Sequence, residues 1–202
     1  MSSDKVLIFN LDETLIYASY ELLPQGSNYI RIDDYYIYIR PHLEESLAKL
    51  AEVYKIGIWT ASSDKYALPI IKALIKVPLV LIFTGEKCVR GHKTMTDYDV
   101  GFLTQYVCFK PLKKVKKRLK IPLSHMLAID NTAQTYKRNY GNGVLVPDFK
   151  GYNGDEILLH LTTFLLKISD REDLRQVPKS LMNWLPTARL SLAPEEPISQ
   201  SH

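Results

Sequence analysis

Polar residues that could carry out chemistry follow three short apolar runs: residues 10–14, residues 60–62, and Asp130 with Asn131. Lys110 precedes a basic segment between the second and third of these. In an open α/β sheet the carboxyl ends of neighbouring strands meet at one edge, so we expect these side chains to converge there. Oxygen ligands suit Mg²⁺, and a lysine suits the negative charge of a phosphoryl group in transfer. The pattern therefore indicates a polar site at the strand ends, whose residue types are compatible with phosphoryl-transfer chemistry.

The segments that must position these residues alternate between strand and helix. Continuous apolar runs predict strands buried on both faces of a parallel sheet, and amphipathic runs predict helices. Pro69 should kink or restart the second helix. The alternation predicts the α/β class, with a parallel sheet flanked by helices on both faces. The predicted strands are 6–9, 55–59, 79–83, 126–129 and 144–146, and the helices 41–51, 65–75, 112–120 and 157–168.

Two further segments and a tail complete the expected organisation. Alternating runs at 29–32 and 35–39 flank two aspartates and predict a β-hairpin. The stretch 84–106 has no strong period and is interpreted as a short insertion. We expect one domain over residues 1–169 and a proline-containing tail over 170–202, irregular apart from one short helix, that could lead to a further domain.

Composition excludes several classes of protein. The 202 residues are 46% hydrophobic and 24% charged, which suffices for a buried core. A net charge of +4 favours phosphorylated partners over cationic ones and does not suggest a nucleic-acid binder. Neither an apolar signal segment nor a span of about 20 apolar residues is present, so we expect a soluble, intracellular protein.

The two cysteines, Cys88 and Cys108, form neither a disulfide framework nor a zinc-binding spacing, which fits a reducing compartment. A thiol-based phosphatase would need an arginine six residues after its cysteine. Thr94 and Lys114 stand at those places. We interpret both thiols as packing residues.

A basic helix is predicted around the apolar face of Leu112, Val115 and Leu119, with six lysines and arginines on its other sides. It is either a solvated face or a docking surface for acidic peptides or anionic lipid. Membrane association is expected only through this helix or through a segment outside the chain.

In these motifs the sequence resembles the haloacid dehalogenase superfamily, and within it the NLI-interacting-factor-like phosphatases related to the small C-terminal-domain phosphatases of RNA polymerase. The resemblance runs from about Val6 to Ile168. It implies a Rossmann-like fold, and neither segment between motifs is long enough for a large cap domain. The matching motifs are Leu11-Asp12-Glu13-Thr14-Leu15, Arg40-Pro41-His42, Thr60-Ala61-Ser62 with Lys65-Tyr66-Ala67, Lys110, and Ile129-Asp130-Asn131.

The resemblance assigns catalytic roles by position. Position 10 would hold the nucleophile that becomes an aspartyl phosphate. Asp12 would protonate the leaving oxygen and later activate water. Thr60 would bind the phosphoryl oxygens, and Lys110 would neutralise their charge.

The resemblance also implies a Mg²⁺ cofactor. The ion would lie between the side chain at position 10, the main-chain carbonyl of Asp12 and the side chain of Asn131. Asp130 would orient these ligands from behind. Considered singly, each residue has a simpler interpretation, because Asp12 and Thr60 could cap helices, Lys110 could be solvated, and Asp130 with Asn131 could form a turn.

The chain departs from the family pattern at Asn10, which stands where the nucleophilic aspartate belongs. A neutral amide is a poor nucleophile, so we expect a magnesium-dependent phosphoprotein phosphatase architecture that does not turn over. Asn10 would mark either a deliberately disabled, substrate-trapping form or a natural pseudophosphatase. The alternative function is a module that binds a phosphopeptide or a membrane partner through Thr60, Lys110 and the basic helix. Phosphoserine, phosphothreonine and phosphotyrosine proteins all remain candidate ligands.

Overall fold

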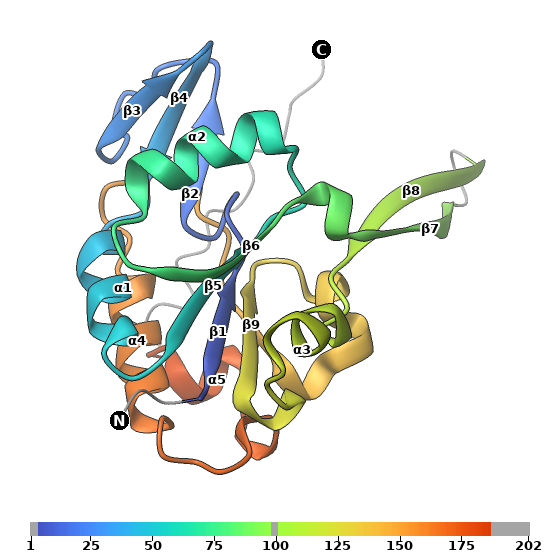
Figure 1. The fold of residues 1–202 in the computed structure, drawn as a ribbon. Helices are drawn as coiled ribbons and strands as arrows, with labels where there is room; N and C mark the ends of the chain where they lie inside the picture. Colours follow the sequence, from blue (N-terminus) through green and yellow to red (C-terminus); the bar gives the residue numbers. More distant parts are fainter. Residues whose placement is uncertain (1–3, 98–100, 187–202) are drawn as a thin grey trace.

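A five-stranded parallel sheet lies at the centre of the protein (Figure 1). The computed structural model describes residues 4–97 and 101–186. The strand order β10-β9-β1-β5-β6 places the first strand of the chain in the middle. This confirms the predicted α/β class. The strands are β1 (Val6–Phe9), β5 (Lys55–Trp59), β6 (Leu79–Phe83), β9 (Met126–Asp130) and β10 (Gly143–Leu145).

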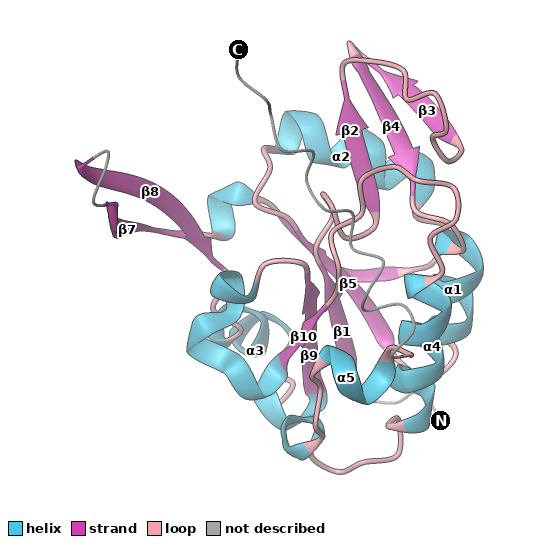
Figure 2. Cartoon of the chain, turned by 180° about the vertical axis from the view of Figure 1, so that it is seen from behind, coloured by secondary structure: helices cyan, strands magenta, loops and turns pink. Residues whose placement is uncertain are grey.

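Both faces of the sheet are covered, as continuous apolar strands require. In β1, Leu7 and Phe9 pack into one core cluster, and Val6 and Ile8 pack into the other. Figure 2 shows α1, α4 and α5 together on one side of the sheet and α3 on the other. The α-helices are α1 (Leu43–Ala51), α2 (Asp64–Leu74), α3 (Lys113–Leu119), α4 (Ile157–Lys167) and α5 (Leu181–Trp184). The 3₁₀ segments are η1 (Gly85–Lys87), η2 (Leu123–His125), η3 (Ala133–Asn142) and η4 (Leu174–Gln176).

Two antiparallel additions extend from this core. The predicted hairpin is present as β3 (Tyr29–Ile32) and β4 (Tyr35–Ile39), and β2 (Ile16–Ser19) joins it in a three-stranded sheet of order β2-β4-β3. The segment interpreted as an irregular insertion forms a two-stranded ribbon, β7 (Val89–Asp97) and β8 (Gly101–Phe109). Figure 1 shows this ribbon projecting away from the central sheet. Strands that project in this way have no common core face, and this explains the missing hydrophobic period.

A kink or a restart was expected at Pro69, and helix α2 does not restart there. It runs from Asp64 to Leu74 with the proline inside. The carbonyl that loses its partner belongs to Lys65, one turn earlier, and Lys65 is exposed. Water can therefore replace the missing hydrogen bond.

The core extends beyond residue 169, where sequence placed the end of the domain. Leu174, Trp184 and Leu185 are buried in the same cluster as α4. The indole of Trp184 stacks on Phe164 at a ring distance of 6.3 Å. In the sequence these apolar residues are scattered among prolines and show no helical period, so the pattern did not reveal them. In the structure they are buried and form part of the core. The rest of the predicted tail, residues 187–202, lies outside the described residues.

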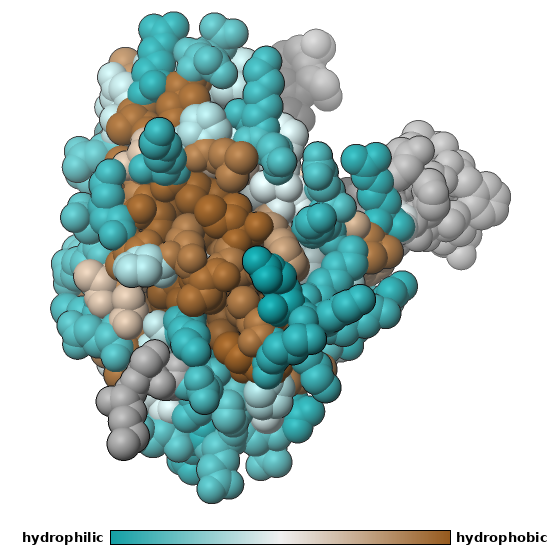
Figure 3. All heavy atoms as spheres, in the orientation of Figure 1, coloured by the Kyte–Doolittle hydropathy of each residue, from teal (hydrophilic) through white to brown (hydrophobic). Residues whose placement is uncertain are grey.

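Hydrophobic side chains also reach the surface along α2 and the edge strand β6. Leu68, Val80 and Ile82 are exposed there, and Figure 3 shows hydrophobic residues gathered on this side of the molecule. Within residues 4–97 and 101–186, no helix is both long enough and apolar enough to cross a bilayer.

Candidate functional site

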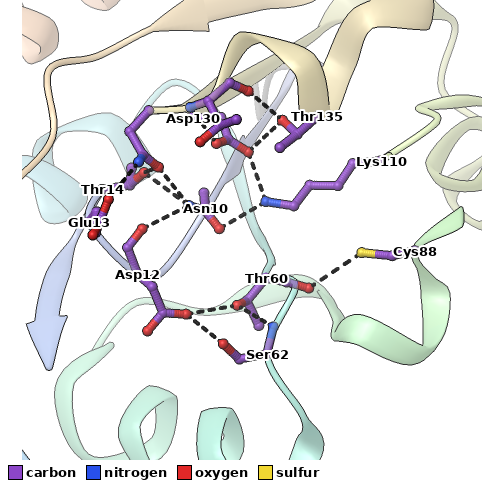
Figure 4. A network of polar contacts seen from close by, with 12 residues as sticks. Asn10, Asp12, Glu13, Thr14, Thr60, Ser62, Cys88, Lys110, Asp130 and Thr135 are labelled. Carbon is purple, nitrogen blue, oxygen red and sulfur yellow. Dashed lines mark hydrogen bonds and ion pairs between the residues drawn. The ribbon is translucent and has the colours of Figure 1, made fainter. Parts of the chain in front are cut away.

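The loops after β1, β5 and β9 meet at the carboxyl edge of the sheet and form one network of polar contacts (Figure 4). Parallel pairing causes this, because Phe9 of β1 pairs with Ile58 of β5 on one side and with Ile129 of β9 on the other. The polar residues that follow each strand are consequently neighbours. The structure brings together all the site residues predicted from sequence: Asn10, Asp12, Thr60, Lys110, Asp130 and Asn131.

Asn10 lies at the centre of this network and is 9% exposed. Its amide nitrogen donates to the main-chain oxygen of Asp12 at 2.9 Å, to Oδ1 of Asn131 at 3.0 Å and to Oγ1 of Thr14 at 3.2 Å. Its amide oxygen accepts from Lys110 at 2.8 Å. The reversed amide would direct its NH₂ group at an ammonium that can only donate. The network therefore fixes the orientation of the Asn10 side chain.

Lys110 is a buried cation held between two partners. Its Nζ lies 2.8 Å from Oδ1 of Asn10 and 2.8 Å from Oδ2 of Asp130. Asp130 also accepts from Oγ1 of Thr135 at 2.8 Å and from the main-chain N–H of Thr132 at 2.9 Å. These bonds compensate for taking both charges out of water. Asp130 thus positions Lys110 instead of facing the oxygens around Asn10.

The carboxylate of Asp12 is held by three hydroxyl groups. Oγ of Ser62 donates at 2.7 Å, the hydroxyl of Tyr66 at 2.7 Å and Oγ1 of Thr60 at 3.1 Å. Burial, together with the neighbouring Asp12, raises the pKa of Tyr66, so that its hydroxyl stays protonated as a donor. Figure 4 shows this carboxylate turned toward Thr60 and Ser62, while the main-chain oxygen of the same residue faces Asn10.

Thr60 is fully buried and takes part in the network in two ways. Its Oγ1 accepts from the main-chain N–H of Ser62 at 3.0 Å and donates to Asp12. The turn after β6 packs closely against this loop. The main-chain N–H of Gly85 donates a hydrogen bond of 2.8 Å to the main-chain oxygen of Ser62. A Cβ at Gly85 would lie 2.4 Å from the carbonyl oxygen of Ala61, so only glycine allows this approach.

Asn131 is oriented from the rim of the site. Its amide nitrogen donates to Oδ1 of Asp148 at 3.0 Å and to Oε2 of Glu13 at 3.2 Å. Lys150 holds Glu13 in turn, at 2.8 Å from Oε1. With its nitrogen engaged at the rim, Asn131 presents its oxygen to Asn10.

Arg40 stabilises the loops that carry the site. The sequence analysis assigned it no role. It is fully buried and makes two hydrogen bonds of 2.9 Å to the carboxylate of Asp155. It also donates to the carbonyl of Thr14 at 2.9 Å and to that of Pro147 at 3.1 Å. One guanidinium thus ties the loop after β1 to the loop after β10. Its sequence signal was the position of an arginine directly after β4.

The sequence analysis assigned no individual role to three other contributors: Ser62, Tyr66 and Thr14. Ser62 and Tyr66 lie inside recognised motifs, but a hydroxyl two or six residues after Thr60 has no distinctive spacing. Only the fold shows that these hydroxyls turn back to Asp12.

The expected Mg²⁺ position can be tested against the donor set around Asn10. The oxygens of Asp12, Asn131 and Thr14 are all neutral, and Asn10 presents an NH₂ group to them. Proteins usually bind Mg²⁺ through one or two carboxylates. Among the described residues, no group of three or more His, Cys, Asp or Glu side chains could hold a metal ion. As it stands, this donor set does not fit a firmly bound Mg²⁺, and a carboxylate at position 10 would supply the missing anionic ligand.

A cavity of about 700 Å³ lies elsewhere in the fold. It is lined by α4 and the segment after it, between Phe164 and Asn183, and by none of the network residues. It contributes nothing to the chemistry of the strand ends.

Comparison with known proteins gives an independent result. The family model "NLI interacting factor-like phosphatase" matches residues 5–175. A "Putative CTD phosphatase-like protein 355R" of Invertebrate iridescent virus 3 is 40% identical over 141 residues, which are 62% of this chain and 69% of that protein. The human "Carboxy-terminal domain RNA polymerase II polypeptide A small phosphatase 1" is 28% identical over 182 residues, 87% of this chain and 64% of that protein.

Other relatives are longer than this chain. "Nuclear envelope morphology protein 1" of Schizosaccharomyces pombe is 27% identical over 185 residues, which are 86% of this chain but 35% of that protein. The chain thus spans less than two thirds of the human and fission yeast relatives. The solved structure titled "The Structure of Fcp1, an essential RNA polymerase II CTD phosphatase" resembles the fold with a TM-score of 0.50 at 18% identity. That likeness covers 84% of this chain and 51% of that one.

Proposed function

This chain belongs to the NLI interacting factor-like phosphatase family, and we propose that its strand-end site holds phosphorylated protein segments without hydrolysing them. The observation that carries the proposal is the position of Asn10. It stands at the centre of the network, next to the buried Lys110, at the position to which the family resemblance assigns the nucleophilic aspartate. Membership makes the architecture that of a protein phosphatase of the haloacid dehalogenase type.

Lys110 and Thr60 support binding of a phosphoryl group. A fixed ammonium attracts a dianion, and a low-dielectric surrounding strengthens that attraction. Exchanging a carboxylate for the amide of Asn10 removes a repulsion of about 1–4 kcal/mol at a separation of roughly 4 Å. The hydroxyls around Asp12 add donors that a phosphate oxygen can take over.

The same residue explains the absence of turnover that we propose. The nitrogen of Asn10 has its protons directed at three oxygens, and its oxygen accepts from Lys110. No anionic lone pair is left to attack phosphorus. Loss of a nucleophile typically costs about 10⁶ in turnover.

In this proposal, Mg²⁺ binds firmly only to a form of the protein that has a carboxylate at position 10. Phosphatases of this type generally depend on Mg²⁺, which when bound neutralises charge on the transferring phosphoryl group. With Asn10 in place, the main-chain oxygen of Asp12 and the side chain of Asn131 already have a donor in the amide. We expect weak Mg²⁺ binding to the unaltered chain.

The charge distribution supports a partner with acidic or multiply phosphorylated flanks. Residues 101–147 contain nine of the 26 lysines and arginines but one of the 22 acidic residues, the buried Asp130. The exposed cations lie on α3 and on η3, and the two segments are joined by a hydrogen bond of 3.1 Å from N–H of Leu112 to Asn139. Figure 3 shows hydrophilic side chains over α3. Such a surface attracts polyanions.

Isothermal titration calorimetry tests the proposal. The unaltered chain is titrated with a phosphoserine peptide, a phosphotyrosine peptide and the same peptides without phosphate, and released phosphate is measured in parallel. We expect binding that requires the phosphate, with no phosphate released. Equal affinity for phosphorylated and plain peptides would refute phosphoryl recognition, and phosphate release would refute the block at Asn10. The phosphopeptide that binds with the higher affinity identifies the ligand class.

A further inference from the structure

The chain's two cysteines, Cys88 and Cys108, lie next to each other at the base of the β7–β8 ribbon, although they are 20 positions apart in the sequence. Val89 of β7 pairs with Phe109 of β8. Cys88 and Cys108 each precede one member of this pair, and strand alternation places them on the same face, diagonally across the ribbon. Both are half-buried free thiols. Lys110, the buried cation of the site, directly follows Phe109 of this pair.

The two thiols differ in character. The thiol of Cys88 contacts that of Cys108 in a side-chain hydrogen bond, which lowers the pKa of Cys88 to about 7, with Lys110 and Lys114 acting in the same direction against burial. The same hydrogen bond, together with burial, raises the pKa of Cys108. A thiolate is the reactive form of cysteine, so Cys88 is suited to attack and Cys108 to respond as a protonated partner.

We propose that Cys88 and Cys108 form a redox modification site for hydroperoxides. The thiolate of Cys88 attacks one peroxide oxygen, so that an S–O bond forms, the O–O bond breaks and the departing oxygen leaves as water after protonation. Cys108 then attacks the sulfur of the sulfenic acid and loses its proton, an S–S bond forms, and a second water leaves. Two thiols lose two electrons, and one hydrogen peroxide is reduced to two waters.

The disulfide would act on the neighbouring phosphoryl site. The thiol of Cys88 donates to the main-chain oxygen of Thr60, with sulfur and oxygen 3.8 Å apart, as Figure 4 shows. An S–S bond removes that donor. The Cβ atoms of two cysteines joined by a disulfide lie about 3.8 Å apart, which is closer than diagonal neighbours on a ribbon. Disulfide formation would therefore draw β7 toward β8, the strand that leads into Lys110. Oxidation is therefore expected to displace both Thr60 and Lys110.

The cross-link is tested by peptide mapping of the full chain after treatment with hydrogen peroxide. We expect loss of both free thiols and a peptide that contains Cys88 joined to Cys108. In the Cys108→Ser variant, dimedone should label a sulfenic acid at Cys88. The Cys88→Ser variant should keep a free Cys108. Absence of the joined peptide, or alkylation of Cys108 as fast as that of Cys88 in the reduced, unaltered chain at neutral pH, would overturn the proposal.

The effect on the site rests on the function proposed above and has its own readout. Phosphopeptide affinity should fall when the disulfide forms and return with dithiothreitol, and it should not respond to peroxide in the Cys88→Ser/Cys108→Ser protein. Unchanged affinity in a protein whose cross-link is mapped would refute the coupling. If the reduced protein binds no phosphopeptide, the proposed function fails, whereas peptide mapping still decides whether the thiols pair.

Discussion

Lys110 donates a hydrogen bond of 2.8 Å to the side-chain oxygen of Asn10, and this bond determines which end of the amide faces the loop oxygens. The nitrogen is left to contact the main-chain oxygen of Asp12 and the side-chain oxygen of Asn131. In the proposed function, these oxygens would face a cation if position 10 carried a carboxylate. Asparagine at this position would then both remove the nucleophile and provide hydrogen-bond donors to the expected metal ligands.

The first prediction concerns the buried pair of Lys110 and Asp130. Lys110→Met should abolish phosphopeptide binding and lower the free energy of unfolding by about 3–5 kcal/mol, because Asp130 keeps a buried charge without its partner. Calorimetry and urea unfolding measure the two effects. The control is Lys110→Met/Asp130→Asn, which should recover most of the stability but none of the affinity. Recovery of binding in that double variant would show that Lys110 does not contact the phosphate.

The second prediction concerns Arg40. Arg40→Met removes the bonds to Asp155 and to the carbonyls of Thr14 and Pro147. It should lower the free energy of unfolding by about 3–5 kcal/mol, because it removes the cationic partner of the largely covered carboxylate of Asp155 and the donor to two carbonyls. Urea unfolding measures this loss. The control is Arg118→Met, at an exposed arginine, which should change the free energy of unfolding by no more than about 0.5 kcal/mol. A loss for Arg40→Met as small as the control's would contradict its assigned structural role.

The third prediction concerns the exposed lysines of α3. Neutralising Lys113, Lys116 and Lys117 to glutamine should weaken binding of an acidic-flanked phosphopeptide by ~1 kcal/mol at low salt, and by less at high salt because of screening. A neutral-flanked phosphopeptide should bind the variant and the unaltered chain alike. If the variant and the unaltered chain bind the acidic peptide with equal affinity, the lysines of α3 form only a solvated surface. Stronger retention on anionic vesicles than on the peptide would instead indicate a lipid partner. The control neutralises three exposed lysines elsewhere: Lys72, Lys76 and Lys167.

The sequence was sufficient to predict where the site lies, because parallel pairing leaves little freedom. Once the strands ending at Phe9, Trp59 and Asp130 are assigned to one sheet, the polar residues after them must be neighbours. The five central strands were recognisable because burial on both faces requires continuous apolar runs. The predicted position of Asn10 follows from these strands, whereas Lys110 directly follows β8 of the ribbon and was assigned through the family resemblance.

Long-range polar contacts and weakly patterned segments could not be predicted in the same way. The bonds of Arg40 to Asp155 and of Tyr66 to Asp12 join residues 115 and 54 positions apart. No local period encodes such a contact. Trp184 likewise joins the core from a segment without regular spacing. The side chains that complete the site thus depend on the packed fold more than on any motif.

The most direct test of the account is to assay the Asn10→Asp variant with para-nitrophenyl phosphate, with and without Mg²⁺. The account predicts that hydrolysis appears only with Mg²⁺, rising by about 10³–10⁶ over the unaltered chain, and that calorimetry detects tighter Mg²⁺ binding. Asn10→Ala, as the control, should fold and remain inactive. A folded Asn10→Asp protein that neither binds Mg²⁺ more tightly nor hydrolyses the substrate would contradict the assignment of position 10 as the missing nucleophile.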